Sequence, residues 1–179
     1  MSKRKRYSVE FKKSILNIRN IRVEDAPKFL ELQQRLDKET SSMLLYPEER
    51  NINVAEIKKN IQMALDRNDY FVIVEDKNKL LGYLHAERGA YKKIQHSLYI
   101  VVGILQEATG NGLGTAMFKS LNSWSITNGV KRLELTVMTT NKVAQHLYSR
   151  MGFKIEGIKS HSIFSQGQYV DEYYMAKIL

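Results

Sequence analysis

The chain has 179 residues, 43% of them hydrophobic and 26% charged, which is the balance of one globular domain and excludes a disordered chain. Cysteine is absent, and this excludes disulfide bonds, catalytic thiols and thiolate metal sites. The net charge of +9 is concentrated in residues 1–22, where eight lysines and arginines accompany one glutamate. We therefore expect a basic N-terminal arm over residues 1–14, which need not be ordered, and a single domain over residues 15–179.

The position of the charge bears on the partners that the chain can have. Because the basic residues gather in the arm and the rest of the chain is nearly neutral, nucleic acid is not the expected partner. No apolar run approaches the roughly 20 residues that cross a bilayer, and no secretory signal follows the N-terminal charges. We expect a cytoplasmic protein without a membrane partner.

The first half of the chain predicts a strand, two helices and then three strands. In chain order these are a strand at 15–19, helices at about 24–36 and 53–65, and strands at 70–75, 80–87 and 97–105. Asn53 and Glu56 resemble a capping box at the start of the second helix. The strand at 97–105 is rich in β-branched residues and almost continuously apolar, so we expect both of its faces to be covered.

The second half predicts a single crossover and a closing hairpin. In chain order these are a helix from about 113 to 127, a strand at 132–138, a helix between Asn141 and Gly152, and strands near 153–158 and 169–178. Antiparallel hairpins thus precede one strand-helix-strand unit. This order indicates a mixed α/β sheet and not a doubly wound one.

The segment that carries the clearest chemistry is the glycine-rich turn at Gly110, Gly112 and Gly114, between an apolar strand and a helix. Amides at a helix N-terminus point outward without partners, and glycines let a phosphate approach them. The turn therefore suits a pyrophosphate, although a tight turn without a ligand has the same pattern. A dinucleotide fingerprint fails because Thr115 and Met117 stand where glycine or alanine is needed, and no P-loop tripeptide is present.

A second cluster lies on the helix that follows Asn141. At 100° per residue, Asn141, Ala144, Gln145 and Tyr148 share one face, so a capping amide and a phenol lie about 10 Å apart along the helix axis. A lone tyrosine on a helix is most often a packing residue. Because the glycine turn precedes this helix, Tyr148 is also a candidate functional residue.

The glycine turn, a helix, a strand and then Asn-x-x-Ala-x-x-Leu-Tyr-x-x-x-Gly-Phe over residues 141–153 resemble the GNAT superfamily of acetyl-CoA-dependent N-acetyltransferases. The resemblance covers roughly residues 15–179. It implies a mixed, mostly antiparallel sheet of six to seven strands, flanked by about four helices, with splayed central strands. It also implies an acyltransferase with acetyl-CoA as co-substrate.

The resemblance assigns residues to the coenzyme. The splayed strand would offer its backbone to the pantetheine at Val102, Gly103 and Ile104. The pyrophosphate cradle would comprise Thr109, Gly110, Asn111, Gly112, Leu113, Gly114 and Thr115, and Asn141 would bind the pantetheine or orient its helix. The family pattern has Gln or Arg where this chain has Thr109, so we expect either a lower affinity for the coenzyme or a substitute charge from Lys119, Lys142 or Arg150.

The implied reaction is direct attack of an amine on the thioester, and without cysteine no thiol can carry the acetyl group. Tyr148 would protonate the departing sulfur, since a phenol keeps its proton at neutral pH. His96 is the first candidate for the base that deprotonates the amine, with Glu134 and Glu87 as weaker ones, although a structural histidine at a strand end is an equal alternative. The four histidines show no metal-ligand spacing, so we expect no metal site.

The acceptor is expected to be a primary amine of a small molecule or of a peptide or protein N-terminus. Acidic residues that could pair with a cationic acceptor are Asp37, Glu39, Asp171 and Glu172. The late hairpin also makes a homodimer an expectation. Two other functions stay open at this point: a nucleic-acid-associated protein that uses the basic arm, and a non-catalytic sensor of acyl-CoA.

Overall fold

The computed structural model describes residues 7–11 and 14–179. Within these residues the strands are β1 (Tyr7–Phe11), β2 (Ser14–Asn20), β3 (Tyr70–Asp76), β4 (Lys79–Arg88), β5 (Ser97–Ile104), β6 (Arg132–Met138), β7 (Lys154–Ser165) and β8 (Gln168–Ile178). The α-helices in the same ranges are α1 (Ala26–Glu39), α2 (Val54–Asp66), α3 (Leu113–Thr127) and α4 (Lys142–Arg150). Short 3-10 turns are η1 (Val23–Asp25), η2 (Pro47–Glu49) and η3 (Gln106–Ala108).

The strands form one mixed sheet in the order β1-β2-β3-β4-β5-β6-β8-β7. All neighbours are antiparallel except β5 and β6, which are parallel and are joined through α3. The predicted mixed α/β class with one crossover is therefore confirmed. The seven expected strands are β2 to β8, and β1 is an additional strand that comes from the segment assigned to the basic arm. The rest of that arm, residues 1–6, lies outside the described residues, as do residues 12–13.

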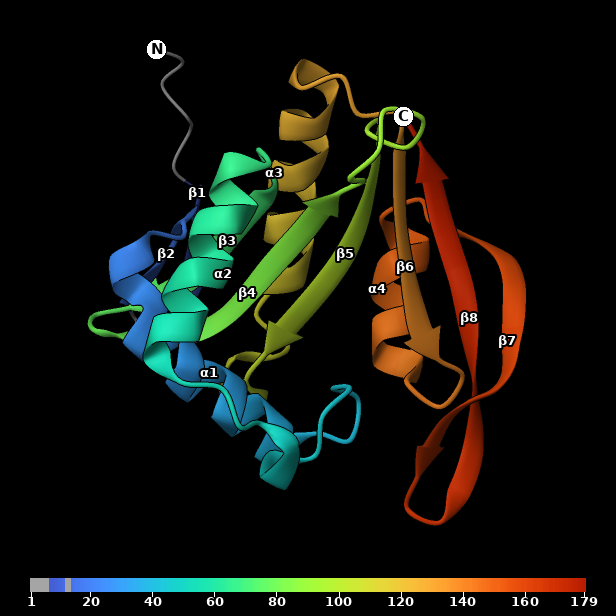
Figure 1. Cartoon of the computed structure of the whole chain (residues 1–179), viewed down its shortest axis with the longest axis horizontal. Helices are drawn as coiled ribbons and strands as arrows, with labels where there is room; N and C mark the ends of the chain where they lie inside the picture. Colours follow the sequence, from blue (N-terminus) through green and yellow to red (C-terminus); the bar gives the residue numbers. More distant parts are fainter. Residues whose placement is uncertain (1–6, 12–13) are drawn as a thin grey trace.

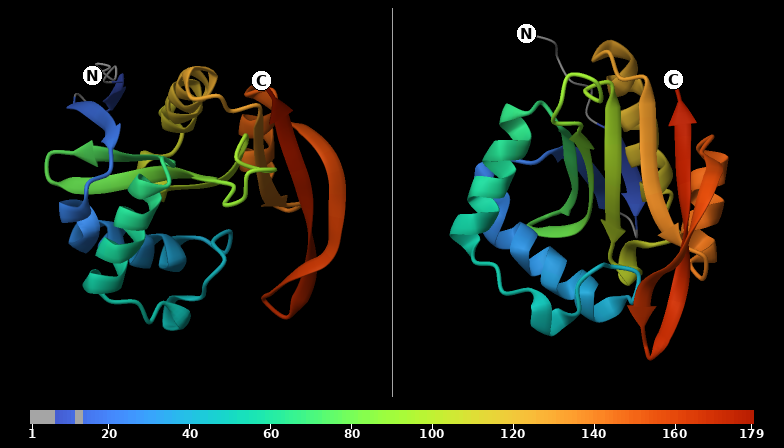
Figure 2. Two further views of the ribbon diagram at one scale, coloured as in Figure 1. Left: turned by 45° about the horizontal axis from the view of Figure 1, so that its top comes forward. Right: turned by 45° about the vertical axis from the view of Figure 1, so that its right-hand side comes forward.

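The helices cover both faces of the sheet, as Figures 1 and 2 show. Helices α1 and α2 lie on one face, and α3 and α4 lie on the other. On the first face, Phe29 of α1 packs edge-on against Phe71 and Tyr83, with ring centroids 5.3 and 5.0 Å away. On the second face, Met117, Phe118 and Leu121 of α3 are buried against the sheet. The apolar faces predicted from helical spacing are thus the faces that fill the core.

Two strands differ from their predictions. β5 was expected to be covered on both faces, but Tyr99 and Val101 are 38% and 40% exposed, so part of the face that looks toward α1 and α2 is open. A continuous apolar run does not distinguish a covered face from the wall of a cavity. β7 was expected to end near residue 158, and it continues to Ser165 through a register irregularity between Lys159 and Ile163.

Candidate functional site

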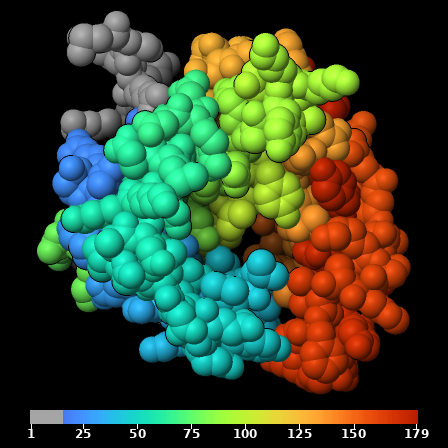
Figure 3. All heavy atoms as spheres, viewed as in Figure 1, coloured from blue at the N-terminus to red at the C-terminus, as the bar shows by residue number. Residues whose placement is uncertain are grey.

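The site begins where β5 and β6 separate. The two parallel strands pair only from Ser97 to Tyr99 on β5, opposite Arg132 to Glu134 on β6. Beyond this point β6 continues along β8, and the edge of β5 that faces β6 has no strand partner from Ile100 to Ile104. The divergence is visible in Figure 1, and Figure 3 shows the surface hollowed between the chain around residues 40–50 and the β7–β8 hairpin. The expected splay of the central strands is therefore present.

The glycine turn follows the open end of β5 and leads into α3. Gly110 and Gly112 have φ angles of +76° and +74°, and a Cβ at either position would meet nothing within 4 Å. The Asn111 side chain holds the turn by donating to the carbonyls of Ala108 (3.2 Å) and Thr109 (2.7 Å). α3 starts at Leu113 without a side-chain cap, so the first amides of the helix have no partner within it. A rigid, open cradle with unused amides fits a phosphate group.

Two of the glycines predicted for the coenzyme have a packing reason. A Cβ on Gly114 would lie 2.7 Å from Leu147 Cδ2, so this glycine lets α4 approach α3. A Cβ on Gly103 would lie 2.7 Å from Leu36 Cδ1 and 3.0 Å from Tyr83, so that glycine lets α1 lie against β5. Val102 and Ile104, on either side of Gly103, lie on the free edge of the strand. The contacts of these three residues with a pantetheine stay a prediction.

Thr109 makes a local hydrogen bond, because its hydroxyl donates to the Gln106 carbonyl at 2.8 Å. It therefore shapes the turn and supplies no positive charge to it. Lys119, Lys142 and Arg150 are exposed on α3 and α4, and none of them forms an ion pair with another described residue. These cations stay available for a coenzyme phosphate.

Tyr148 lies on α4 and is 7% exposed. Its ring packs on Phe118 and Phe153, with centroids 5.6 and 6.1 Å away. The hydroxyl has no hydrogen-bond partner among the described residues, and it is not one of the fully enclosed polar atoms, so it opens to solvent. Burial, together with the nearby Tyr99 phenol, raises the pKa of Tyr148, so the group keeps its proton across the neutral range.

Asn141 caps α4 and also reaches across the opening. Its Oδ1 accepts from the Ala144 amide at 3.1 Å, which is the predicted cap. Its Nδ2 donates to the Ser42 hydroxyl at 3.1 Å. This contact ties the chain between α1 and α2 to the far side of the splay.

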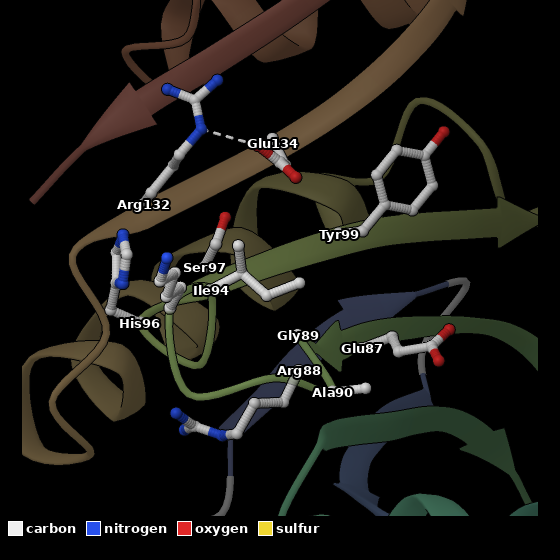
Figure 4. Close-up of a pocket in the computed structure, with 11 residues that line it drawn as sticks. Glu87, Arg88, Gly89, Ala90, Ile94, His96, Ser97, Tyr99, Arg132 and Glu134 are labelled. Atoms are coloured by element: carbon white, nitrogen blue, oxygen red, sulfur yellow. Dashed lines mark hydrogen bonds and ion pairs between the residues drawn. The ribbon is translucent and has the colours of Figure 1, made fainter.

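The three bases proposed from the sequence line a single cavity of about 440 Å³ at the closed end of the splay. His96, Glu87 and Glu134 all belong to its lining. Figure 4 shows His96 at one end of this cavity and Tyr99 at the other, with Glu134 bound to Arg132, whose Nε donates to it at 2.6 Å. His96 is exposed and precedes β5, so the structure places it at the opposite end of that strand from the glycine turn.

Comparison with known proteins decides the family. A family model described as the acetyltransferase (GNAT) family matches residues 26–153, more than half of the chain. The chain belongs to the GNAT family. It is therefore an acyltransferase of that family, as the glycine turn and the Asn141–Phe153 segment predicted.

Similar proteins agree with this assignment. The L-amino acid N-acetyltransferase AaaT of Escherichia coli is 45% identical over 49 residues, which are 27% of this chain and 30% of that protein. An uncharacterized N-acetyltransferase of Bacillus subtilis, YobR, is 38% identical over 50 residues, which are 28% of this chain and 20% of that protein. The match thus spans less than a third of either relative.

Solved structures share the fold over nearly the whole chain. A GNAT-family acetyltransferase from Streptococcus pneumoniae superimposes with a TM-score of 0.87 at 25% identity, covering 92% of this chain and 99% of that one. A phosphinothricin acetyltransferase from Sinorhizobium meliloti, solved in complex with acetyl-CoA, gives a TM-score of 0.81 at 17% identity, covering 92% and 88%. At that identity the second likeness concerns the fold alone.

The acidic residues considered for a cationic acceptor are all engaged within this GNAT domain. Asp37, whose side chain is fully buried, binds Arg50, and the other three accept hydrogen bonds from nearby groups. The donors are the Gln106 amide for Glu39 (2.9 Å), the His161 amide for Asp171 (2.8 Å) and the Lys159 ammonium for Glu172 (3.2 Å). Sequence alone did not reveal these partners, which lie 10 to 67 residues away.

A second cavity of about 400 Å³ lies between α1, α2 and the open face of β3 to β5. Its lining includes Gln33, Arg50, Tyr83, His85 and Val101. Tyr83 is almost fully buried, and burial raises its pKa to about 12, against a smaller lowering by Arg50. The sequence analysis did not assign these residues to a site. A signal was present, because His85 and Glu87 alternate with the buried Leu84 and Ala86 and therefore lie on the opposite face of β4.

Across residues 7–11 and 14–179, no three histidine, aspartate or glutamate side chains gather as metal ligands, and no helix is long and apolar enough to cross a bilayer.

Proposed function

We propose that this GNAT protein transfers the acetyl group of acetyl-CoA directly to a primary amine of a small molecule or of a peptide N-terminus. The observation that carries the proposal is the convergence of three features on the splay: the open cradle at α3, the unpaired edge of β5 and the solvent-accessible hydroxyl of Tyr148. A sensor of acyl-CoA would need the cradle and the strand edge but not the Tyr148 phenol.

Each feature has a separate task. Acetyl-CoA supplies a thioester whose carbonyl is open to an amine. The amides at Leu113 and Gly114, in the first turn of α3, bind phosphate, and the free backbone of β5 between Ile100 and Ile104 orients the pantetheine arm and donates to the carbonyl oxygen. Tyr148 donates a proton to the sulfur as it leaves. Lys119, Lys142 or Arg150 supplies the positive charge for the phosphate that Thr109 cannot supply.

The cavities on the open face of β4 and β5 would admit the acceptor. Three of the four acidic residues considered at first, Asp37, Glu39 and Glu172, are each paired with a cation of the chain, and this disfavours a polycation as the acceptor. The relative AaaT is named for action on L-amino acids, and this supports amino acids as the first small amines to examine.

The experiment has two steps. Millimolar acetyl-CoA should raise the melting temperature by about 5–10 °C if its concentration is near 100 times Kd. Thiol release is then followed with a panel of L-amino acids, peptides with free N-termini and polyamines. We expect release with at least one primary amine. No thermal shift would contradict coenzyme binding altogether, and a shift without release across the panel would leave an acyl-CoA sensor instead of an enzyme.

A further inference from the structure

His85 lies on β4, and its ring lines the cavity between α1, α2 and β3 to β5. The ring stacks on Phe71 with centroids 4.3 Å apart and an interplanar angle of 15°, so its orientation is set by packing. Its Nε2 lies 2.8 Å from Oδ2 of Asp69, the residue just before β3. The side chain is 21% exposed, and it lines the cavity beside Val101. The stacked ring and the carboxylate together leave little freedom to the imidazole.

The hydrogen bonds of Asp69 favour its ionised form. Its side chain is fully buried, and besides His85 it accepts from the Arg88 amide at 2.9 Å and from Arg67 Nη2 at 2.9 Å. Burial acts to raise the pKa of Asp69, but the three hydrogen bonds outweigh it and the pKa is lowered. An ionised carboxylate can only accept, so Nε2 of His85 must carry its proton.

The other ring nitrogen of His85, Nδ1, is open to the cavity. It has no hydrogen-bond partner among the described residues, and it is not one of the enclosed polar atoms without a partner. With the proton held on Nε2, Nδ1 presents a lone pair. The imidazole therefore has the arrangement of a general base that a carboxylate holds in one tautomer.

His85 lies beside the part of β5 that the proposed acetyl transfer assigns to the coenzyme. His85 is the cross-strand partner of Val101, so the two side chains lie on one face of adjacent strands, which are about 4.8 Å apart. Val101 lies within the segment of β5 whose other edge is free at the splay. An amine in the cavity between α1, α2 and β4 thus lies between His85 and the carbonyl that β5 orients.

We propose that His85, positioned by Asp69, is the base that takes the proton from the acceptor amine. This inference rests on the proposed acetyl transfer and deepens it. The proton passes from the ammonium group to Nδ1, and the neutral amine then forms the C–N bond while the C–S bond breaks. The sulfur takes the proton of Tyr148, the second proton that the nitrogen loses restores the Tyr148 phenol, and His85 returns its own proton to solvent.

The other bases near the splay are less available. Glu87 is paired with Arg67 Nη1 at 3.0 Å, and Glu134 with Arg132. His96 lies before the first residue of β5 and has no buried carboxylate partner among the described residues. Nε2 and the stacked ring already hold His85 in place, and the unbonded Nδ1 is the atom that remains able to accept a proton.

The test uses His85→Gln, whose amide nitrogen can still donate to Asp69 but whose side chain cannot take up a proton. We expect kcat/KM to fall about 100-fold, with the acetyl-CoA Kd and the melting temperature unchanged. His146→Gln, on the exposed face of α4, is the control and should leave turnover unchanged. In His85→Ala, added imidazole should restore part of the lost rate.

The pH profile gives a readout that a structural role would not move. In the wild type, log kcat/KM should rise with pH as the imidazolium loses its proton, and His85→Gln should lose this acid limb. The charged and titratable groups that face His85 from the surrounding elements are Asp69, Arg67, Glu87, Arg50 and Tyr83. If His85→Gln kept the acid limb and wild-type turnover, the proposed role of His85 and Asp69 would be wrong, and the proposed acetyl transfer would be unaffected.

The tautomer can be checked without turnover. Long-range ¹H–¹⁵N spectra of the wild-type protein should show neutral His85 with a proton on Nε2 and none on Nδ1. A proton on Nδ1 of the neutral ring would contradict the proposal whether or not an acceptor amine is found, whereas missing thiol release with the expected tautomer would contradict only the acetyl transfer.

Discussion

At the scale of single residues, Tyr148 combines burial with access. Its ring packs on Phe118 and Phe153, yet its hydroxyl reaches solvent at the splay. Burial raises the pKa of Tyr148, so the phenol keeps its proton across the neutral range. A group that must deliver one proton to a thiolate needs this combination of a fixed ring and a retained proton.

Tyr148→Phe should therefore separate chemistry from packing. The ring and its contacts are kept, so the free energy of unfolding should change by less than about 1 kcal/mol. Without the acid, kcat should fall about 100-fold, while the Kd for acetyl-CoA stays the same. The rate of thiol release measures the fall in kcat, and thermal melting measures the change in stability. Tyr169→Phe, at an exposed position of β8, is the matched control, and equal rates in the two variants would remove the role of Tyr148.

At the scale of elements, α3 carries a glycine with positive φ at each end. Gly112 at its N-terminus has φ +74°, and Gly129, just beyond its C-terminus, has φ +70°; neither has an atom within 4 Å of a Cβ position. An alanine costs about 1–2 kcal/mol of left-handed strain at both ends. Only the alanine at position 112 would place its methyl group in the proposed cradle.

Gly112→Ala and Gly129→Ala should thus have equal stability and different coenzyme affinity. We expect both to lose about 1–2 kcal/mol in chemical denaturation. Gly112→Ala should also weaken acetyl-CoA binding more than tenfold in calorimetry, because the methyl group keeps the phosphate from the amides. Equal affinity in the two variants would mean that the turn does not bind the coenzyme.

At the scale of the whole molecule, the sheet consists of two parts joined by a short pairing. β1 to β5 and β6 to β8 meet over three residue pairs, and the chain between α1 and α2 adds contacts across the gap, from Ser42 to Asn141 and from Tyr46 to the Phe164 carbonyl. The core beneath α1 stabilises the first part. Tyr83 lies in that core, so its titration reports on the folding of the part that contains β1 to β5.

The buried Tyr83 predicts a loss of stability at high pH. Its pKa is about 12 in the folded chain and about 10 when exposed, so between these values the folded state keeps a proton that the unfolded state has lost. The free energy of unfolding therefore falls as the pH rises, by about 1.4 kcal/mol per pH unit from this group. Tyr83→Phe should make the slope between pH 10 and 12 shallower by that amount in urea denaturation. Tyr91→Phe, at an exposed position, should not alter the slope.

The four helices, seven of the strands and the local parts of the site could be predicted from the sequence. Helical spacing placed α1 to α4, the Asn53 capping box was observed as predicted, and the glycine turn and the Asn141–Tyr148 face were recognisable because they depend on neighbours within a few residues. These same segments carried the family resemblance that the comparisons confirmed.

Which side chains are free to act depends instead on the tertiary structure. The sequence left Asp37 and Glu39 as acceptor ligands, and the fold joins them to Arg50 and the Gln106 amide; it also joins His85 to Asp69 and opens one face of β5. Such partners come together through strand register and helix packing. No local period encodes them, because the energy of a buried polar group depends on what the fold places within hydrogen-bond distance of it.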